Sequence, residues 1–147
     1  GVFAREFEPL GRAIEIGVAS GSVISVSFPG TPGADADPEH PLFDRIDAYL
    51  GGRSDHFDDV EIALTVPTDH RQVLAATRNV PYGETVSLDR VVRMAGLDPD
   101  DDDARETTRT ALAGNPIPLF VPAHRVRDAP GGAPPEVADR LRAIESE

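Results

Sequence analysis

The segment LFVPAHRV, residues 119–126, has the residue types of a catalytic centre without its nucleophile. An apolar run ends at Pro122, and Ala123 then stands directly before His124 and Arg125. A histidine held at the end of a buried strand is suited to act as a general base on a neighbouring hydroxyl or thiol. Because the neighbouring side chain here is a methyl group, the pattern indicates a base whose partner is missing.

The chain contains no cysteine. This excludes disulfide bonds, thiolate zinc sites and any cysteine nucleophile. Three of the four histidines, His40, His56 and His70, are scattered among loops and helix starts, which favours surface positions over a metal site. The acidic run at residues 98–103 lacks the glycine and the distal glutamate of an EF-hand loop. We therefore expect no metal and no cofactor.

The charge is strongly acidic, with 26 aspartate and glutamate residues against 14 basic residues and a net charge of −12. Every basic residue is an arginine. An acidic surface without lysine is typical of proteins from a salt-saturated cytosol, so we expect a halophilic source, in particular a haloarchaeon. Acidity normally argues against a nucleic-acid partner. At molar salt, however, the screening length is only about 3 Å, which weakens that argument.

The length of 147 residues suits one domain or two small ones with a real core. No apolar run approaches the roughly 20 residues that a membrane span requires, and no signal peptide is visible. The sequence therefore predicts a monomeric cytoplasmic protein without a membrane partner.

The elements that must position the histidine fall into two groups, and the first is a small α/β domain over residues 1–66. Two β-branched runs, at 13–18 and 23–28, flank a Ser-Gly-Ser turn and predict a β-hairpin. Apolar residues at helical spacing, between a proline and a glycine, predict a helix over 41–50. Alternation of apolar residues over 60–66 predicts a half-buried strand.

The second group, residues 67–147, is expected to be a mainly helical domain. Two of its short helices, joined by a turn, suggest a helix-turn-helix. The expected order is a helix capped by Thr68 and running to about Arg78, a turn and short strand in VPYGETVS, a helix capped by Ser87 and ending at Gly96, a helix from 103 stopped by Gly114, an apolar strand at 119–121 and a final helix over PPEVADRLRAIE.

Three motifs of the second half occur in a characteristic order: VPYGETVS, then AG, then TALAGNPIPLFVPAHRV. Together they resemble the O6-alkylguanine-DNA alkyltransferase family over roughly residues 68–126, and more weakly towards both ends. Members of that family transfer an alkyl group from a flipped guanine to their own cysteine, once, in the motif Pro-Cys-His-Arg-Val. The resemblance implies an α+β fold, with an N-terminal α/β domain and a C-terminal winged-helix-like DNA-binding domain.

The resemblance also implies roles for individual residues of the active site. Ala123 stands where the family has its cysteine, and His124 and Arg125 match the rest of that motif. Asn115 matches the Asn-Pro pair that braces the site, and Glu145 matches the carboxylate that orients the histidine. A methyl group has no lone pair to accept an alkyl group, so transfer by the family mechanism is chemically excluded for this chain.

The DNA-binding residues depart from the family pattern. Leu88 replaces a tyrosine that helps to turn the target nucleotide out, and Glu106 replaces an arginine that fills the vacated space in the duplex. Arg105 and Arg109 flank Glu106 and are the cations that this helix offers to DNA, and Arg125 is a further candidate. The loop after the His-Arg-Val motif is short and lacks the tyrosine-glycine lid over the base.

Each of these assignments has an alternative. His124 can be a buried, hydrogen-bonded remnant of an active ancestor. Arg105 and Arg109 can pair with the aspartates at 100–103, and Glu145 can be a solvated charge near a fraying chain end.

Three hypotheses for the function follow. The first is an inactive alkyltransferase-like protein that binds O6-alkylguanine in duplex DNA, weakly, and hands the lesion to a protein of another repair pathway. The second is an active alkyltransferase whose cysteine was engineered to Ala123. That single change does not explain Leu88, Glu106, the short loop or the absence of every other cysteine. The third is a scaffold or regulatory module that kept the fold and does not bind DNA.

Overall fold

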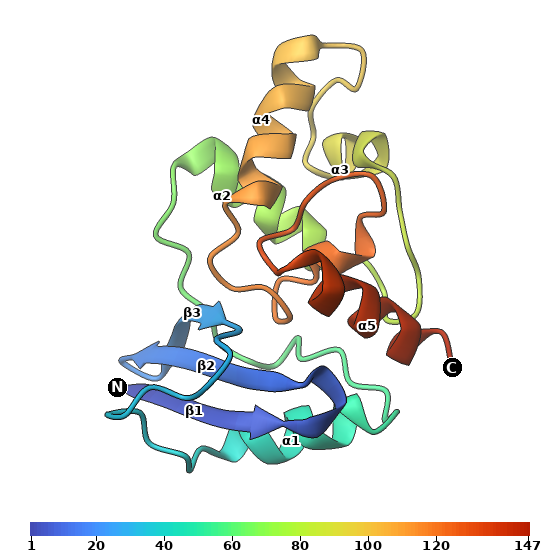
Figure 1. Ribbon diagram of the computed structural model, residues 1–147. Helices are drawn as coiled ribbons and strands as arrows, with labels where there is room; N and C mark the ends of the chain where they lie inside the picture. The colour runs from blue at the N-terminus through green and yellow to red at the C-terminus, as the bar shows by residue number, and fades with distance from the viewer.

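A computed structural model describes all residues from Gly1 to Glu147. A three-stranded antiparallel sheet has helix α1 on one side and the helices α2 to α5 on the other (Figure 1). This arrangement confirms the predicted α+β class. None of the helices is both long and apolar enough to cross a membrane.

The sheet consists of β1 (Val2–Phe7), β2 (Arg12–Ala19) and β3 (Ser22–Ser27), paired in that order. The predicted hairpin is β2 and β3, while β1 was not predicted. Both residues at the tip of the hairpin, Ser20 and Gly21, have positive φ angles, of 52° and 81°. Such turns match the right-handed twist of the strands that they join.

Helix α1 (Pro41–Leu50) confirms the predicted helix and packs its apolar side onto the sheet. The ring of Phe43 meets that of Phe7 from β1 at 5.8 Å, edge to face. The imidazole of His40 caps the helix by accepting a hydrogen bond from the backbone N–H of Leu42 (3.1 Å). The same face of α1 buries Tyr49, which the functional site uses below.

The strand predicted over residues 60–66 is wrong. The segment runs along β3 through a single isolated bridge, between Ile62 and Val23, with two backbone hydrogen bonds. Its alternating apolar side chains are buried or half-buried, as the pattern indicates. Alternation therefore reported burial correctly, but burial of every second side chain does not require a continuous ladder of hydrogen bonds.

The second half contains the four predicted helices, α2 (Thr68–Thr77), α3 (Leu88–Met94), α4 (Asp102–Ala113) and α5 (Pro135–Glu145). Ser87 caps α3, as predicted, by accepting from the N–H of Arg90 (3.2 Å), and Asp101 caps α4. Thr68 is the first residue of α2 rather than its cap. Helices α3 and α4 pack against each other and against α2, with the connection 95–101 between them (Figure 1).

The strand predicted at residues 119–121 is also wrong, although the run is buried. The N–H of Val121 donates to the carbonyl of Ile117 (2.9 Å), so the chain coils there, and Leu119 has a φ of 81°. Prolines at 116, 118 and 122 remove the N–H groups that a strand would offer to a neighbour. The coil ends in a 3-10 turn over Ala123–Arg125.

One hydrophobic cluster includes residues from both sides of the boundary expected between residues 66 and 67, so that boundary remains a prediction. The rings of Phe57 and Phe120 meet at 5.3 Å, edge to face. The backbone N–H of Val26 in β3 donates to the carbonyl of Pro116 (2.9 Å).

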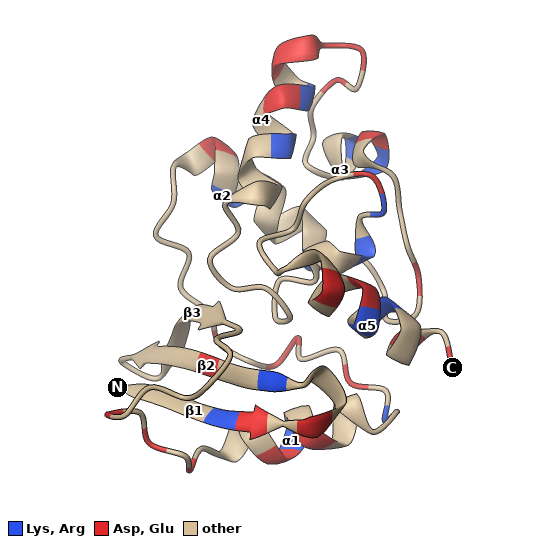
Figure 2. Cartoon of the chain, viewed as in Figure 1, with Lys and Arg blue, Asp and Glu red and all other residues tan.

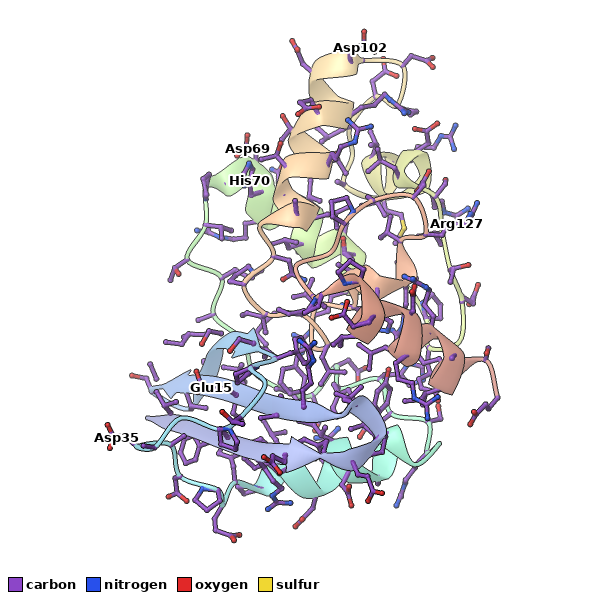
Figure 3. All side chains as sticks on the ribbon, in the orientation of Figure 1. Glu15, Asp35, Asp69, His70, Asp102 and Arg127 are labelled. Atoms are coloured by element: carbon purple, nitrogen blue, oxygen red, sulfur yellow. The ribbon has the colours of Figure 1, made fainter.

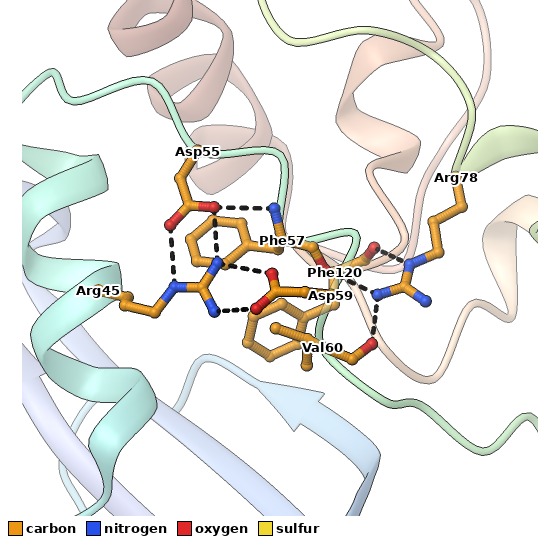
Figure 4. A network of polar contacts seen from close by, with 7 residues as sticks. All are labelled: Arg45, Asp55, Phe57, Asp59, Val60, Arg78 and Phe120. Carbon is orange, nitrogen blue, oxygen red and sulfur yellow. Dashed lines mark hydrogen bonds and ion pairs between the residues drawn. The ribbon is translucent and has the colours of Figure 1, made fainter.

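Two arginines organise the connection between the halves (Figure 4). Arg45 on α1 binds the carboxylates of Asp55 and Asp59 at 2.8 to 3.0 Å, with its guanidinium over the ring of Phe57. Arg78, directly after α2, donates to three carbonyl oxygens, those of Phe57 (2.8 Å), Val60 (2.6 Å) and Phe120 (3.2 Å). The planar guanidinium fork reaches acceptors on two separate segments at once.

We expect Arg78→Lys to lower the free energy of unfolding by about 2 kcal/mol, because a single ammonium cannot bind carbonyls on both segments. Urea unfolding followed by circular dichroism measures the change. Arg71→Lys, an exposed position of α2, is the matched control and should shift the value by no more than about 0.5 kcal/mol. Equal losses in the two variants would refute the role given to Arg78.

Candidate functional site

The turn Ala123–Arg125 is buried within the second half of the chain. The three residues are 1%, 4% and 3% exposed. The turn is fixed by the segment before α3, because the N–H of Val86 donates to the carbonyl of Arg125 (2.8 Å) and the N–H of Arg127 donates back to Val86 (3.0 Å). The whole turn therefore belongs to the core.

Glu145, the last residue of α5, enters this core from the other end of the sequence. The apolar positions Val137, Leu141 and Ile144 form the buried stripe of α5 and carry the adjacent glutamate inward. Its carboxylate lies 2.7 Å from Nε2 of His124. The alternative of a solvated terminal charge is therefore wrong, since the side chain of Glu145 is only 3% exposed.

Arg125 and two further donors complete the surroundings of this carboxylate. Arg125 donates from Nε to Oε1 (2.8 Å) and from Nη2 to Oε2 (3.0 Å) of Glu145. The backbone N–H of Gly83 donates to Oε1 (3.2 Å), and the hydroxyl of Tyr49 donates to Oε2. We call Tyr49, Gly83, His124, Arg125 and Glu145 the Glu145 cluster; its members come from α1, the turn after α2, the buried turn and α5.

The pKa shifts within the Glu145 cluster indicate which of its side chains carry protons. Burial acts to raise the pKa of Glu145, but hydrogen bonds from His124 and Arg125 outweigh it and hold that pKa well below its ordinary value. Burial lowers the pKa of His124, although Glu145 opposes the shift. Burial and the adjacent carboxylate raise the pKa of Tyr49. At neutral pH the cluster thus holds an ionised Glu145, a neutral His124 and a protonated Tyr49.

Neutral His124 has one ring nitrogen without a partner. The carboxylate of Glu145 can only accept, so Nε2 of His124 carries the proton and donates to it. Nδ1 of His124 is left as an acceptor. Nδ1 is buried and has no hydrogen-bond donor. An unmade hydrogen bond of this kind costs about 1–3 kcal/mol. The pair has the form of an oriented general base, but the preceding residue, Ala123, offers it no proton to accept.

The space beside Ala123 is closed by the loop that leads to α5. A Cβ added to Gly131 would lie 2.7 Å from the Cβ of Ala123, so the glycine backbone rests on the methyl group. Asn115 holds this loop, because its side-chain amide donates to the carbonyls of Gly131 (3.2 Å) and Val121 (3.1 Å). The structure therefore shows a closed site, without room for a base over Ala123.

Two residues expected to contact DNA lie inside the protein instead. Leu88 is 2% exposed, because the first turn of α3 faces the core. The guanidinium of Arg125 is 4% exposed, because it neutralises Glu145 and donates to the carbonyl of Val80 (2.8 Å). Neither side chain reaches the surface in this structure.

The two arginines of α4 are paired with carboxylates. Arg105 binds Asp89 on α3, and Arg109 binds Glu106 one turn earlier on α4 (3.0 Å). The partners differ from the aspartates at 100–103 that the alternative interpretation named. Figure 2 shows those aspartates gathered at the N-terminal end of α4, whereas arginines lie further along α4 and on α3.

Sequence reasoning missed four residues of this region. Tyr49 lies 96 positions from Glu145, and its helical spacing indicated only a core position. Arg90, Arg93 and Arg127 are exposed and form no ion pair. The spacing of three between Arg90 and Arg93, on a helix whose other side is apolar, was an available indication that they share a surface.

Residues 68–145 match the family model described as "6-O-methylguanine DNA methyltransferase, DNA binding domain". A methylated-DNA–protein-cysteine methyltransferase from Methanopyrus kandleri is 31% identical over 112 residues, which cover 74% of this chain and 81% of the relative. One from Metallosphaera sedula is 33% identical over 85 residues, which cover 58% of this chain and 51% of the relative. The chain thus spans about half the length of the latter.

Two further similarities extend this picture. A DNA base-flipping protein from Thermus thermophilus is 32% identical over 105 residues, which cover 71% of this chain and 67% of that protein. The crystal structure of Mycobacterium tuberculosis OGT in complex with DNA superposes with a TM-score of 0.76 at 22% identity, covering 99% of this chain and 92% of that chain. The second similarity establishes a shared fold over almost the whole chain.

We expect Glu145→Gln to lower the free energy of unfolding by about 3–5 kcal/mol, because it leaves the buried charge of Arg125 without a counter-ion. Chemical denaturation at neutral pH measures the change. Glu147→Gln, at an exposed position two residues later, removes the same charge and should have an effect near zero. A loss for Glu145→Gln no larger than that of this control would contradict a structural role for the buried ion pair.

The depressed pKa of His124 predicts that acidification destabilises the fold. Below about pH 6.5 the unfolded chain binds a proton that the buried imidazole refuses, so stability falls by up to about 1.4 kcal/mol per pH unit. Glu145 adds to the loss only below its ordinary pKa of about 4.3. Unfolding measured between about pH 8 and pH 5 should therefore be flat and then decline, and His124→Asn should remove most of the decline.

A second histidine needs a control in that experiment. Half-buried His40 also has a pKa lowered by burial, so His40→Asn is measured in parallel and should remove a smaller part of the decline. A decline that His124→Asn leaves intact would mean that the buried imidazole accepts protons in the folded state.

Proposed function

Because the chain belongs to the 6-O-methylguanine DNA methyltransferase family, we propose that it is a cysteine-less, alkyltransferase-like DNA repair protein. In this proposal it binds O6-alkylguanine lesions in duplex DNA and flags them for another repair pathway, without transferring the alkyl group. The observation that carries the proposal is Ala123, which occupies the nucleophile position beside His124 and Glu145 in a chain without cysteine.

The chemistry of alkyl transfer explains why this observation weighs so heavily. Transfer requires a nucleophile lone pair that forms a bond to the alkyl carbon while the bond from that carbon to the guanine oxygen breaks. Ala123 supplies no lone pair. The free lone pair of His124, at Nδ1, is buried, and the other ring nitrogen donates to Glu145. Recognition of the lesion does not need such a lone pair, so the absence of a nucleophile is compatible with it.

Recognition of an extruded base needs no cysteine, because unstacking depends on contacts to the base and backbone. The similarity to a Thermus thermophilus protein named for base flipping supports this part of the proposal. Entry of a base would require the loop at Gly131 to move away from Ala123. Breaking the contacts of that loop costs binding energy, so we expect weak affinity with a modest preference for the lesion.

The experiment has two readouts on one sample. Intact-protein mass spectrometry after incubation with an O6-methylguanine duplex should show an unchanged mass, whereas a cysteine-containing family member gains one methyl group. Affinity for duplexes with and without the lesion should be measurable and should favour the lesion. A methyl adduct on the protein, or no binding to either duplex, would overturn the proposal.

A scaffold without DNA binding is the second candidate. The closed loop over Ala123 and the paired arginines of α4 favour it. It predicts no affinity for either duplex at any salt concentration at which the protein is folded, so the same binding experiment separates the two candidates.

We expect Glu106→Arg to strengthen duplex binding. Glu106 is exposed on α4 at the position where the family inserts an arginine, and its carboxylate both repels phosphates and holds Arg109. The substitution removes that carboxylate, releases Arg109 and supplies a cation. Affinity for one duplex, measured at two salt concentrations, tests it, with Glu136→Arg on α5 as a control of equal charge change. If both variants gain equally, the effect is one of net charge and not of this position.

A further inference from the structure

We propose that the phosphates of duplex DNA are held by an arginine surface on α3 and the segment beside it, formed by Arg90, Arg93 and Arg127. The arginines of α4 are not the main cations. This inference rests on the proposed function and names the residues that would give it its affinity.

The first argument is that these three cations are free. All three side chains belong to exposed residues, and none lies within ion-pair distance of a carboxylate. The only side-chain hydrogen bond of the three arginines runs from Nη1 of Arg127 to the carbonyl of Thr85 (3.2 Å). An unpaired guanidinium binds a phosphate without first breaking an internal ion pair, and its planar fork suits phosphate oxygens.

The second argument is that the fold gathers them. Leu88, Val91 and Val92 bury one side of α3, which leaves Arg90 and Arg93, three positions apart, on the opposite side. The segment that contains Arg127 forms backbone hydrogen bonds with Val86, just before α3. The next residue, Asp128, accepts a hydrogen bond from the N–H of Leu88 (2.6 Å). Figure 3 shows Arg127 beside α3. Asp102, at the acidic N-terminal end of α4, lies well away from it.

The third argument is that Asp89 and Asp128, the carboxylates next in sequence to Arg90 and Arg127, are already engaged. Asp89 binds Arg105, and Asp128 caps the start of α3. Glu84, Asp98 and Asp100 are further exposed carboxylates nearby in sequence. The three arginines are therefore cations without an ion-pair partner on a chain whose net charge is −12.

The arginines outside this surface do not form a comparable group. Several are paired with carboxylates or buried, and three exposed ones without ion pairs, Arg53, Arg71 and Arg140, lie on separate elements of the fold. In helix-turn-helix proteins the first helix crosses the DNA backbone while the second enters a groove. The position of α3 before α4 matches that geometry, which favours duplex DNA as the partner.

The test measures duplex affinity of Arg90→Ala, Arg93→Ala and Arg127→Ala over roughly 0.1 to 1 M salt, where the screening length falls from about 10 Å to about 3 Å. Each substitution should weaken binding equally for damaged and undamaged duplexes. Each should also reduce the slope of log affinity against log salt by about 0.9, the value for one lost phosphate contact. Circular dichroism at each salt concentration verifies that every variant is folded.

Two controls separate this surface from general charge effects. Arg53→Ala removes the same charge from the loop after α1 and should leave the salt slope unchanged. The charge-neutral double variant Arg5→Ala with Asp44→Ala removes an ion pair between β1 and α1 in the first half of the chain, and it should also leave the slope unchanged.

The outcomes distinguish the inference from the function on which it rests. If the wild-type protein binds DNA and the three surface variants keep its slope, the inference is wrong while the proposed function stands. The same conclusion follows if Arg53→Ala lowers the slope as much as they do. If the wild-type protein binds no duplex at any of these salt concentrations, the proposed function fails and the inference fails with it.

Discussion

The buried carboxylate of Glu145 is the constraint on which the rest of the structure depends. Removal of a carboxylate from water costs several kcal/mol, and the cost is offset only if the charge is neutralised and its lone pairs are filled. Tyr49, Gly83, His124 and Arg125 do both, and they come from three separate parts of the chain. The sheet layer, the turn after α2, the motif turn and α5 must therefore be in place together, which ties both halves of the chain to one charge.

Because of this constraint, His124 and Glu145 have a structural role that does not require a reaction. Loss of Glu145 would leave Arg125 as an uncompensated buried charge, and loss of His124 would leave Glu145 short of one donor. A base-and-orienter pair is normally evidence for catalysis. Here the same pair stabilises the core, so its presence does not decide between an active and an inactive protein. What the pair lacks is a proton donor or nucleophile at the neighbouring position, Ala123.

What the sequence predicted well was local. Ser87 as a helix cap and the hairpin at Ser20 and Gly21 depend on a few adjacent residues, and both appear in the structure. The run at 119–121 was predicted as a strand because apolar content indicates burial but does not show that three prolines deprive the segment of ladder donors. The role of Tyr49 in the site was out of reach for a different reason. Its partner is 96 residues away, and no local pattern encodes such a contact.

The closed turn around Ala123 and the exposed arginines of α3 are physically separate parts of this chain. Ala123 is locked by its contact with Gly131, so restoring a sulfur there would also require the loop to be displaced from Asn115. The exposed arginines Arg90 and Arg93 make no core contacts of comparable kind, so substitutions among them leave the fold intact. The interior is therefore constrained by the packing around Ala123, whereas the exposed arginines can be substituted without disturbing that packing.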